Sequence, residues 1–160
     1  MLPDTLTQAQ YDTVYNLLSL VIASQLFTAI FLVVVQPRVL PRYRQAIVVS
    51  AMVCGIAAYH YIRIFNSFNE AYVATAVGGD YTLTPFGFNE AYRYVDWLLT
   101  VPLLLLETVA VLALPKATRA SLLGKLIPAS ILMIVLGYPG EVAVVAGPDV
   151  EEATIKGAIR

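Results

Sequence analysis

The chain has 160 residues, of which 59% are hydrophobic and 13% are charged, and its mean hydropathy is +0.73. Soluble domains carry roughly 45–50% apolar and about 25% charged residues, so this composition indicates a membrane protein. The net charge is −1 and no polybasic stretch occurs, so nucleic acid is not an expected partner. A lone cysteine, Cys54, excludes an intramolecular disulfide and a cysteine-based cluster; it is expected to pack in the core, and no metal site is predicted.

Four apolar stretches are each long enough to cross a bilayer as a helix, which takes about 20 residues. No basic residue precedes the first stretch, so it does not resemble a cleavable secretion signal and is expected to stay in the protein. Pro139 and Gly140 are predicted to end the fourth. The chain is read as a single transmembrane domain over 1–160, with helices at approximately 10–36, 45–65, 90–114 and 119–138 and the start of a fifth at 150–160.

A polar connection separates the second and third predicted helices. It contains Gly78-Gly79-Asp80 between two short segments rich in β-branched and aromatic residues, 72–74 and 81–83. Glycine and aspartate favour tight turns, so this pattern predicts a short β-hairpin outside the membrane.

Charges in the connections predict an orientation, because lysine and arginine are retained on the cytoplasmic side. The first and third connections carry only basic residues: Arg38, Arg42, Arg44, Lys116, Arg119 and Lys125. The opposite side collects the acids: Asp4, Asp12, Glu70, Asp80, Glu90, Glu141, Asp149, Glu151 and Glu152. The N-terminus is therefore expected outside, and the third helix runs inward.

Two carboxylates, Asp96 and Glu107, lie within the third helix. An ionised side chain at mid-bilayer costs at least about 2.5–3.5 kcal/mol, so such residues suggest an ion or proton path. They are about three turns and 16 Å apart on one face, with Asp96 nearer the outside. Arg93 favours ionised Asp96, and Thr100 can donate a hydrogen bond to its carboxylate, whereas apolar neighbours favour protonated Glu107. Asp96 could then accept a proton and Glu107 donate one.

His60, the only histidine, lies in the second helix at the predicted depth of Asp96. A lone membrane histidine is often a hydrogen-bonded packing residue. An imidazole beside Asp96, however, could hold the carboxylate anion and tune its pKa near neutrality. Because His60 and Asp96 are predicted at the same depth, a functional role for His60 is preferred over simple packing.

Residues 92–107, YRYVDWLLTVPLLLLE, resemble the third helix of the microbial rhodopsins, specifically the proteorhodopsin and xanthorhodopsin branch with its Asp-Thr-Glu triplet. The segment LGYPGE at 136–141 and the pair His60-Tyr61 resemble the same branch, so the likeness covers essentially the whole chain. The resemblance implies an all-α bundle of seven transmembrane helices, of which about four and a half are present here.

The resemblance also implies a light-driven outward proton pump with all-trans retinal bound to a lysine as a protonated Schiff base. Asp96 would be counterion and proton acceptor with His60 as its partner, and Glu107 would be the proton donor. Thr100, Arg93 and Tyr61 would support the acceptor and the exit path. The residues expected to line the retinal pocket are Trp97, Val101, Leu104, Met133 and Gly137, for which ordinary helix packing is the competing interpretation. Leu104 suggests green-light absorption.

The sequence departs from the family pattern in one respect. The family's retinal lysine lies on the seventh helix, whereas Lys116, Lys125 and Lys156 lie in connections or near helix ends. The 160 residues alone are therefore expected to bind no retinal covalently, and the chain is interpreted as a portion of a longer protein.

Other functions remain open at this point. A photosensory rhodopsin that signals to a transducer protein is the alternative, although it would not need Glu107; a membrane scaffold would leave both carboxylates unexplained. Resemblance further suggests a prokaryotic cell membrane, a ring-shaped homo-oligomer, and a carotenoid antenna if Gly157 is the glycine on the fifth helix against which it packs.

Overall fold

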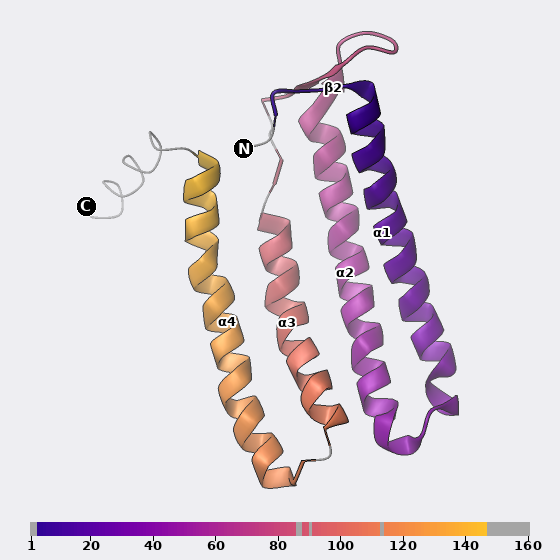
Figure 1. The fold of residues 1–160 in the computed structure, drawn as a ribbon, viewed down its shortest axis with the longest axis vertical. Helices are drawn as coiled ribbons and strands as arrows, with labels where there is room; N and C mark the ends of the chain where they lie inside the picture. The colour runs from indigo at the N-terminus through magenta and orange to yellow at the C-terminus, as the bar shows by residue number, and fades with distance from the viewer. Residues whose placement is uncertain (1–2, 86–87, 90, 113, 147–160) are drawn as a thin grey trace, which may run out of the picture.

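The computed structural model describes residues 3–85, 88–89, 91–112 and 114–146. Its four long helices pack side by side in chain order, α1 on α2, α2 on α3 and α3 on α4 (Figure 1). Each of the four is long and apolar enough to cross a membrane. They are α1 (Gln8–Val35), α2 (Arg44–Ala71), α3 (Ala91–Val111) and α4 (Lys116–Ala146), and two single-turn 3₁₀ helices, Gln36–Arg38 and Pro41–Tyr43, join α1 to α2.

Helix α1 begins at a capping box. The Thr7 hydroxyl accepts a hydrogen bond from the main-chain N–H of Gln10 at 3.3 Å, and the Gln10 side chain accepts one from the N–H of Thr7 at 3.0 Å. These two bonds satisfy N–H groups that have no partner within the helix. Apolar side chains surround α1 on all sides and none of its residues is buried, as expected for a peripheral helix in contact with lipid.

Helix α2 lies between α1 and α3 and contributes much of the buried surface. The buried side chains between Arg44 and Ala58 are four alanines and one valine, and small residues let membrane helices approach closely. They are Ala46, Val49, Ala51, Ala57 and Ala58.

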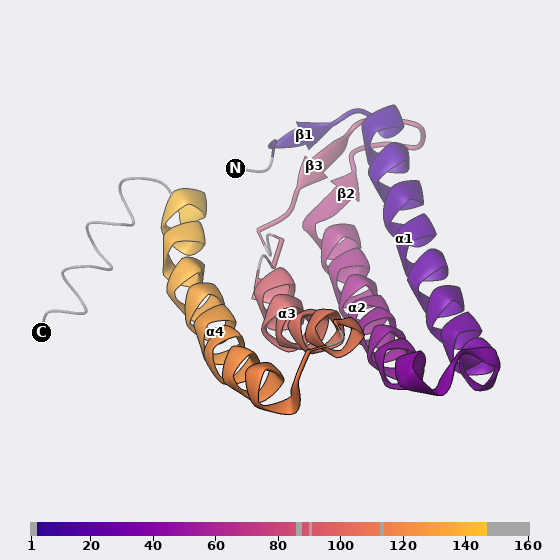
Figure 2. The same cartoon turned by 60° about the horizontal axis from the view of Figure 1, so that its bottom comes forward.

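A three-stranded antiparallel sheet covers one end of α1 and α2 (Figure 2). Strands β2 (Tyr72–Ala74) and β3 (Tyr81–Leu83) form the predicted hairpin, and Gly78 takes a positive φ of 72° in its turn. The sequence did not predict the third member, β1 (Thr5–Leu6), which pairs with β3 on its other edge. The hairpin is thus confirmed, with the N-terminal segment added to it.

Aromatic rings attach this sheet to the helices. The Tyr11 ring stacks on Tyr81 at a centroid distance of 3.8 Å and on Phe68 at 5.0 Å. The Tyr11 hydroxyl donates to the Asn69 side chain at 2.9 Å, and the buried Tyr72 hydroxyl donates to the Pro3 carbonyl at 2.9 Å. One cluster therefore joins all three strands to α1 and α2.

Two helices are longer than their predicted ranges. Helix α2 continues from the predicted end near residue 65 to Ala71, because Phe68 and Ala71 are buried in the aromatic cluster. Helix α4 continues through Pro139 to Ala146. Proline removes one main-chain hydrogen bond and can kink a helix without ending it, and here the helix continues for seven residues beyond Pro139. The predicted fifth helix lies outside the described residues.

Candidate functional site

The predicted acceptor residues are buried between α2 and α3. Asp96 and His60 are each 7% exposed and Thr100 is 4% exposed, so all three belong to the interior of the helix layer. Asp96 and Thr100 are one turn apart on α3, and this face of the helix is directed at α2. The structure thus buries His60 of α2 and the pair Asp96 and Thr100 of α3 in the interior of the same helix layer.

Asp96 and His60 interact electrostatically across this interface. Each also has a buried polar atom, Asp96 Oδ1 and His60 Nδ1, without a hydrogen-bond partner in the described part of the chain. A buried carboxylate oxygen without a partner is costly, so this position suits a cationic group or ordered water supplied by the rest of the protein.

Thr100 does not make the predicted hydrogen bond. Its hydroxyl donates to the main-chain carbonyl of Asp96 at 2.9 Å, and not to the carboxylate. A threonine inside a helix readily bonds the carbonyl four residues earlier, and this local bond prevails here.

Glu107 has a polar partner that the sequence analysis missed. The Ser50 hydroxyl on α2 donates to Glu107 Oε1 at 2.5 Å, and the same hydroxyl lies 3.1 Å from the Ala46 carbonyl. The Cys54 thiol, one turn further along α2, interacts electrostatically with Glu107. The only sequence signal was a serine within an apolar helix at the depth of Glu107, which is weak because serine often bonds its own helix.

The remaining predicted polar residues, Arg93 and Tyr61, lie on the same side of the layer as Asp96 and His60, away from Glu107. Arg93 is half-buried one turn from Asp96, and Tyr61 is half-buried beside His60. Nearby, Arg63 on α2 donates to the Tyr92 hydroxyl at 3.1 Å. This interhelical bond was not predicted, and it joins α2 to the first turn of α3 near the acceptor residues.

The residues predicted to line a retinal pocket lie on a different face of the layer. On α3, the side chains of Trp97 and Leu104 are 44% and 46% exposed, and on α4 that of Met133 is 62% exposed; Gly137 is exposed and Val101 half-buried. The described helices therefore leave four of these positions open to lipid or to further helices and cover the fifth, Val101, in part.

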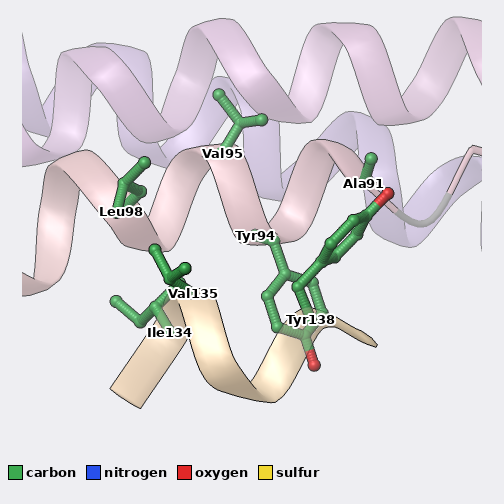
Figure 3. A pocket seen from close by; sticks show the side chains of 7 residues that line it. All are labelled: Ala91, Tyr94, Val95, Leu98, Ile134, Val135 and Tyr138. Atoms are coloured by element: carbon green, nitrogen blue, oxygen red, sulfur yellow. The ribbon is translucent and has the colours of Figure 1, made fainter. Parts of the chain in front are cut away.

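A separate cavity of about 300 Å³ lies between α3 and α4 (Figure 3). None of the five predicted retinal-pocket residues lines it. By helical periodicity, its α3 residues lie on a face distinct from that of Trp97 and Leu104. The lining residues are Ala91, Tyr94, Val95, Leu98, Ile134, Val135 and Tyr138.

Comparison with known sequences places this chain in a family. The profile of the bacteriorhodopsin-like proteins matches residues 13–155. The chain is 35% identical over 127 residues to the green-light absorbing proteorhodopsin of Gamma-proteobacterium EBAC31A08, covering 79% of this chain and 45% of that protein. It is 34% identical over 130 residues to the blue-light absorbing proteorhodopsin of Gamma-proteobacterium Hot 75m4, covering 81% of this chain and 46% of that protein. The chain thus spans about half the length of these relatives.

Solved structures agree with the sequence relatives. Xanthorhodopsin, described as a light-driven ion pump with dual chromophore, superposes with a TM-score of 0.82 at 50% identity, covering 89% of this chain and 56% of that one. Thermophilic rhodopsin superposes with a TM-score of 0.82 at 48% identity, with the same coverage of 89% and 56%. This chain therefore belongs to the bacteriorhodopsin-like family and is a microbial rhodopsin of the proteorhodopsin and xanthorhodopsin type.

Proposed function

We propose that this chain is part of a light-driven pump that moves protons out of the cell, with Asp96 as proton acceptor and Glu107 as proton donor. The observation that carries the proposal is the position of these two carboxylates on the α2 side of one membrane-spanning helix, each beside a different polar partner on α2. The similarity to proteorhodopsins and to the light-driven ion pump xanthorhodopsin supports a light-driven pump.

Asp96 is suited to take up a proton. Its burial makes an isolated anion costly, and His60 at the same depth supplies a group that can share or compensate the charge. Its Oδ1 atom, buried and without a partner in the described residues, is the place where a proton would be held.

Glu107 is suited to keep a proton until it is needed. Ser50 has one hydroxyl proton and two acceptors within reach, the Ala46 carbonyl and Glu107 Oε1. When Ser50 donates to Ala46, its oxygen is free to accept a hydrogen bond from protonated Glu107. Ser50 can therefore hydrogen-bond to Glu107 both with and without its proton, as a group that gives up and regains a proton requires.

Retinal fits the residues that are present. Bound to a lysine as a protonated Schiff base, it would supply the cation and the light-driven proton release. Asp96 Oδ1 could compensate that cation. Trp97, Val101, Leu104, Met133 and Gly137 offer an apolar surface on α3 and α4 that the described helices leave open. Lys116 lies on the first turn of α4, and Lys125, which is exposed, lies on its third turn, nearer the middle of the span than the sequence predicted. Both belong to the half of α4 that begins opposite the sheet, whereas Asp96 lies nearer the sheet, so the proposal takes the lysine from another part of the protein.

The direction of transport follows from the connections. The α1–α2 and α3–α4 connections lie at one end of the layer, opposite the sheet (Figure 1). At this end, Arg38 and Arg42 lie in the α1–α2 connection, and Lys116 and Arg119 lie on the first turn of α4. By the positive-inside rule this end is cytoplasmic and the N-terminus is outside. Asp96 then lies towards the outside and Glu107 towards the cytoplasm, so net movement is outward.

Two further assignments rest on resemblance. Assembly into a homo-oligomer in a prokaryotic cell membrane is one of them. A carotenoid as second chromophore is the other, suggested by the dual chromophore of xanthorhodopsin; Gly157, the residue considered for it, lies outside the described residues. Absorption by carotenoid-supplied full-length protein that drives transport would test it.

The pump is tested with the full-length protein in cells supplied with retinal. Illumination is expected to acidify an unbuffered medium, and an uncoupler should abolish the signal while replacement of sodium or chloride should leave it unchanged. Alkalinisation, or a signal that requires either of those ions, would contradict an outward proton pump.

A further inference from the structure

A small cavity with two arginines lies at the end of the layer opposite the sheet. It has a volume of about 150 Å³ and lies where the α1–α2 connection meets the end of α3 and the first turn of α4. The residues that line it are Arg42, Tyr43, Ala110, Val111, Leu112 and Arg119.

The two guanidinium groups come from different elements, Arg42 from the α1–α2 connection and Arg119 from α4. Arg42 is exposed, and its guanidinium lies over the Tyr43 ring at 4.5 Å from its centroid, a contact that favours this side-chain position. Arg119, on the first turn of α4, is half-buried, and its Nε is buried without a hydrogen-bond partner among the residues that the structure describes. By contrast, the Arg44 guanidinium donates to the carbonyls of Val39 and Pro37 and so belongs to the loop itself.

On α3, the acid nearest the cavity is Glu107, one turn before Ala110 and Val111, and it accepts a hydrogen bond from Ser50 on α2. In the sequence, no acidic residue occurs between Asp12 and Glu70 or between Glu107 and Glu141. A buried guanidinium donor without a partner is costly, and arginine forks match the oxygens of a phosphate group. The cavity is therefore suited to an anion with several oxygen acceptors.

The surroundings favour an anion that carries an apolar chain. Val111 and Leu112 line the cavity and are 49% and 48% exposed, and Leu40 nearby in the connection is 60% exposed. A free phosphate ion would leave these side chains uncovered, whereas the acyl chain of a lipid would cover them. Basic pockets at the cytoplasmic ends of membrane helices have this combination when they bind lipid headgroups.

We propose that this cavity binds the phosphate group of an anionic phospholipid of the cytoplasmic leaflet, held by Arg42 and Arg119, with its acyl chain against Val111 and Leu112. The site is about as far from Asp96 as the layer allows, and it needs no retinal. Binding would fasten the α1–α2 and α3–α4 connections to each other and to the membrane.

The test uses the full-length protein in nanodiscs of phosphatidylcholine with or without a minority of phosphatidylglycerol. Native mass spectrometry counts the retained phosphatidylglycerol, and thermal loss of the visible band reports stability. The unmodified protein is expected to retain phosphatidylglycerol and to gain in thermal midpoint. Arg42→Gln and Arg119→Gln should each weaken retention about tenfold, the effect of losing one charge-assisted contact.

Arg38→Gln is the matched control, because Arg38 lies in the same connection but does not line the cavity. It should retain phosphatidylglycerol like the unmodified protein. Arg42→Lys and Arg119→Lys keep the charge but lose the forked guanidinium, so their retention of phosphatidylglycerol should lie between that of the unmodified protein and that of the glutamine variants. If a glutamine variant does not fold, reduced retention in the lysine variants tests the site instead. Equal loss in Arg38→Gln, full retention in the double glutamine variant, or an equal stability gain with inorganic phosphate in detergent would each overturn the proposal.

Discussion

Asp96 and Glu107 are separated by eleven residues on α3, or about 16 Å along the helix axis. Each has its own partner on α2, His60 for the first and Ser50 for the second. The distance is too great for direct transfer between the two carboxylates, so under the proposed function each would exchange protons separately, Asp96 on the outer and Glu107 on the inner side. Single substitutions should therefore have different effects at the two sites.

Replacing the proposed acceptor should stop transport. Asp96→Asn keeps the size of the side chain but removes the group that can hold a proton, so light-driven acidification by cells with the full-length protein is expected to fall to background. Asp12→Asn, the same change at an exposed residue on the sheet side, should leave it unaltered. Acidification by Asp96→Asn at the unmodified rate would show that the acceptor is another group.

Replacing the proposed donor should slow the cycle without preventing the first proton transfer. Glu107→Gln is expected to lengthen recovery after a flash by tenfold or more, since removal of an acid or base catalyst typically costs about 10²–10⁴-fold. Recovery should also become slower as the pH rises, because protons then come from the medium. Unchanged recovery would refute the donor role.

Ser50 should affect the same step more weakly. Ser50→Ala removes one hydrogen bond of about 1 kcal/mol from protonated Glu107, so recovery is expected to change several-fold. Ser24→Ala is the control, because the Ser24 hydroxyl donates only to the Val21 carbonyl of its own helix. If both variants recover alike after a flash, Ser50 does not support the donor.

At the scale of elements, the sheet joins the N-terminal segment to the α2–α3 connection. The Tyr72 side chain is 4% exposed and bonds the Pro3 carbonyl, and burial, with a smaller effect from Asp4, raises the pKa of Tyr72 above its ordinary value. The folded protein therefore holds this proton more tightly than the unfolded chain. Its contribution to stability is present below about pH 10 and is lost as the pH rises through the raised pKa.

This predicts a pH-dependent effect of Tyr72→Phe. At neutral pH the variant should be less stable by about 1 kcal/mol, the value of one hydrogen bond, but its thermal midpoint should fall less steeply above pH 10. Circular dichroism of the full-length protein measures both. Tyr81→Phe, which keeps the stacked ring, serves as the control; the same slope in Tyr72→Phe and the unmodified protein would exclude the linkage.

The sequence was sufficient for the elements whose pattern is local. Long uncharged runs predicted the spanning helices, and Gly78-Gly79-Asp80 predicted the hairpin. Strand β1 was missed because two residues show no periodicity, and they form a strand only by pairing with β3. The shared face of Asp96 and Glu107 follows from the period of a single helix, so the sequence predicted it. The contact of Ser50 with Glu107 depends on how α2 and α3 pack against each other, so the sequence did not predict it.

At the scale of the whole molecule, the described helices form an incomplete enclosure. The α2 side of α3 is buried, whereas Trp97, Leu104 and Met133 remain open. Membrane proteins cover such apolar faces with lipid or with further helices, and the matched part of this chain covers only 45% and 56% of two of its relatives. We expect the other helices of the protein to pack on this face and to close the retinal pocket.

The most direct test of the central claim is flash-induced infrared difference spectroscopy of the full-length protein. The account predicts that a protonated-carboxyl band appears first, is absent in Asp96→Asn, and is followed by transient loss of a second such band that is absent in Glu107→Gln. A first band that persists in Asp96→Asn, or a second that persists in Glu107→Gln, would contradict the assignment of acceptor and donor.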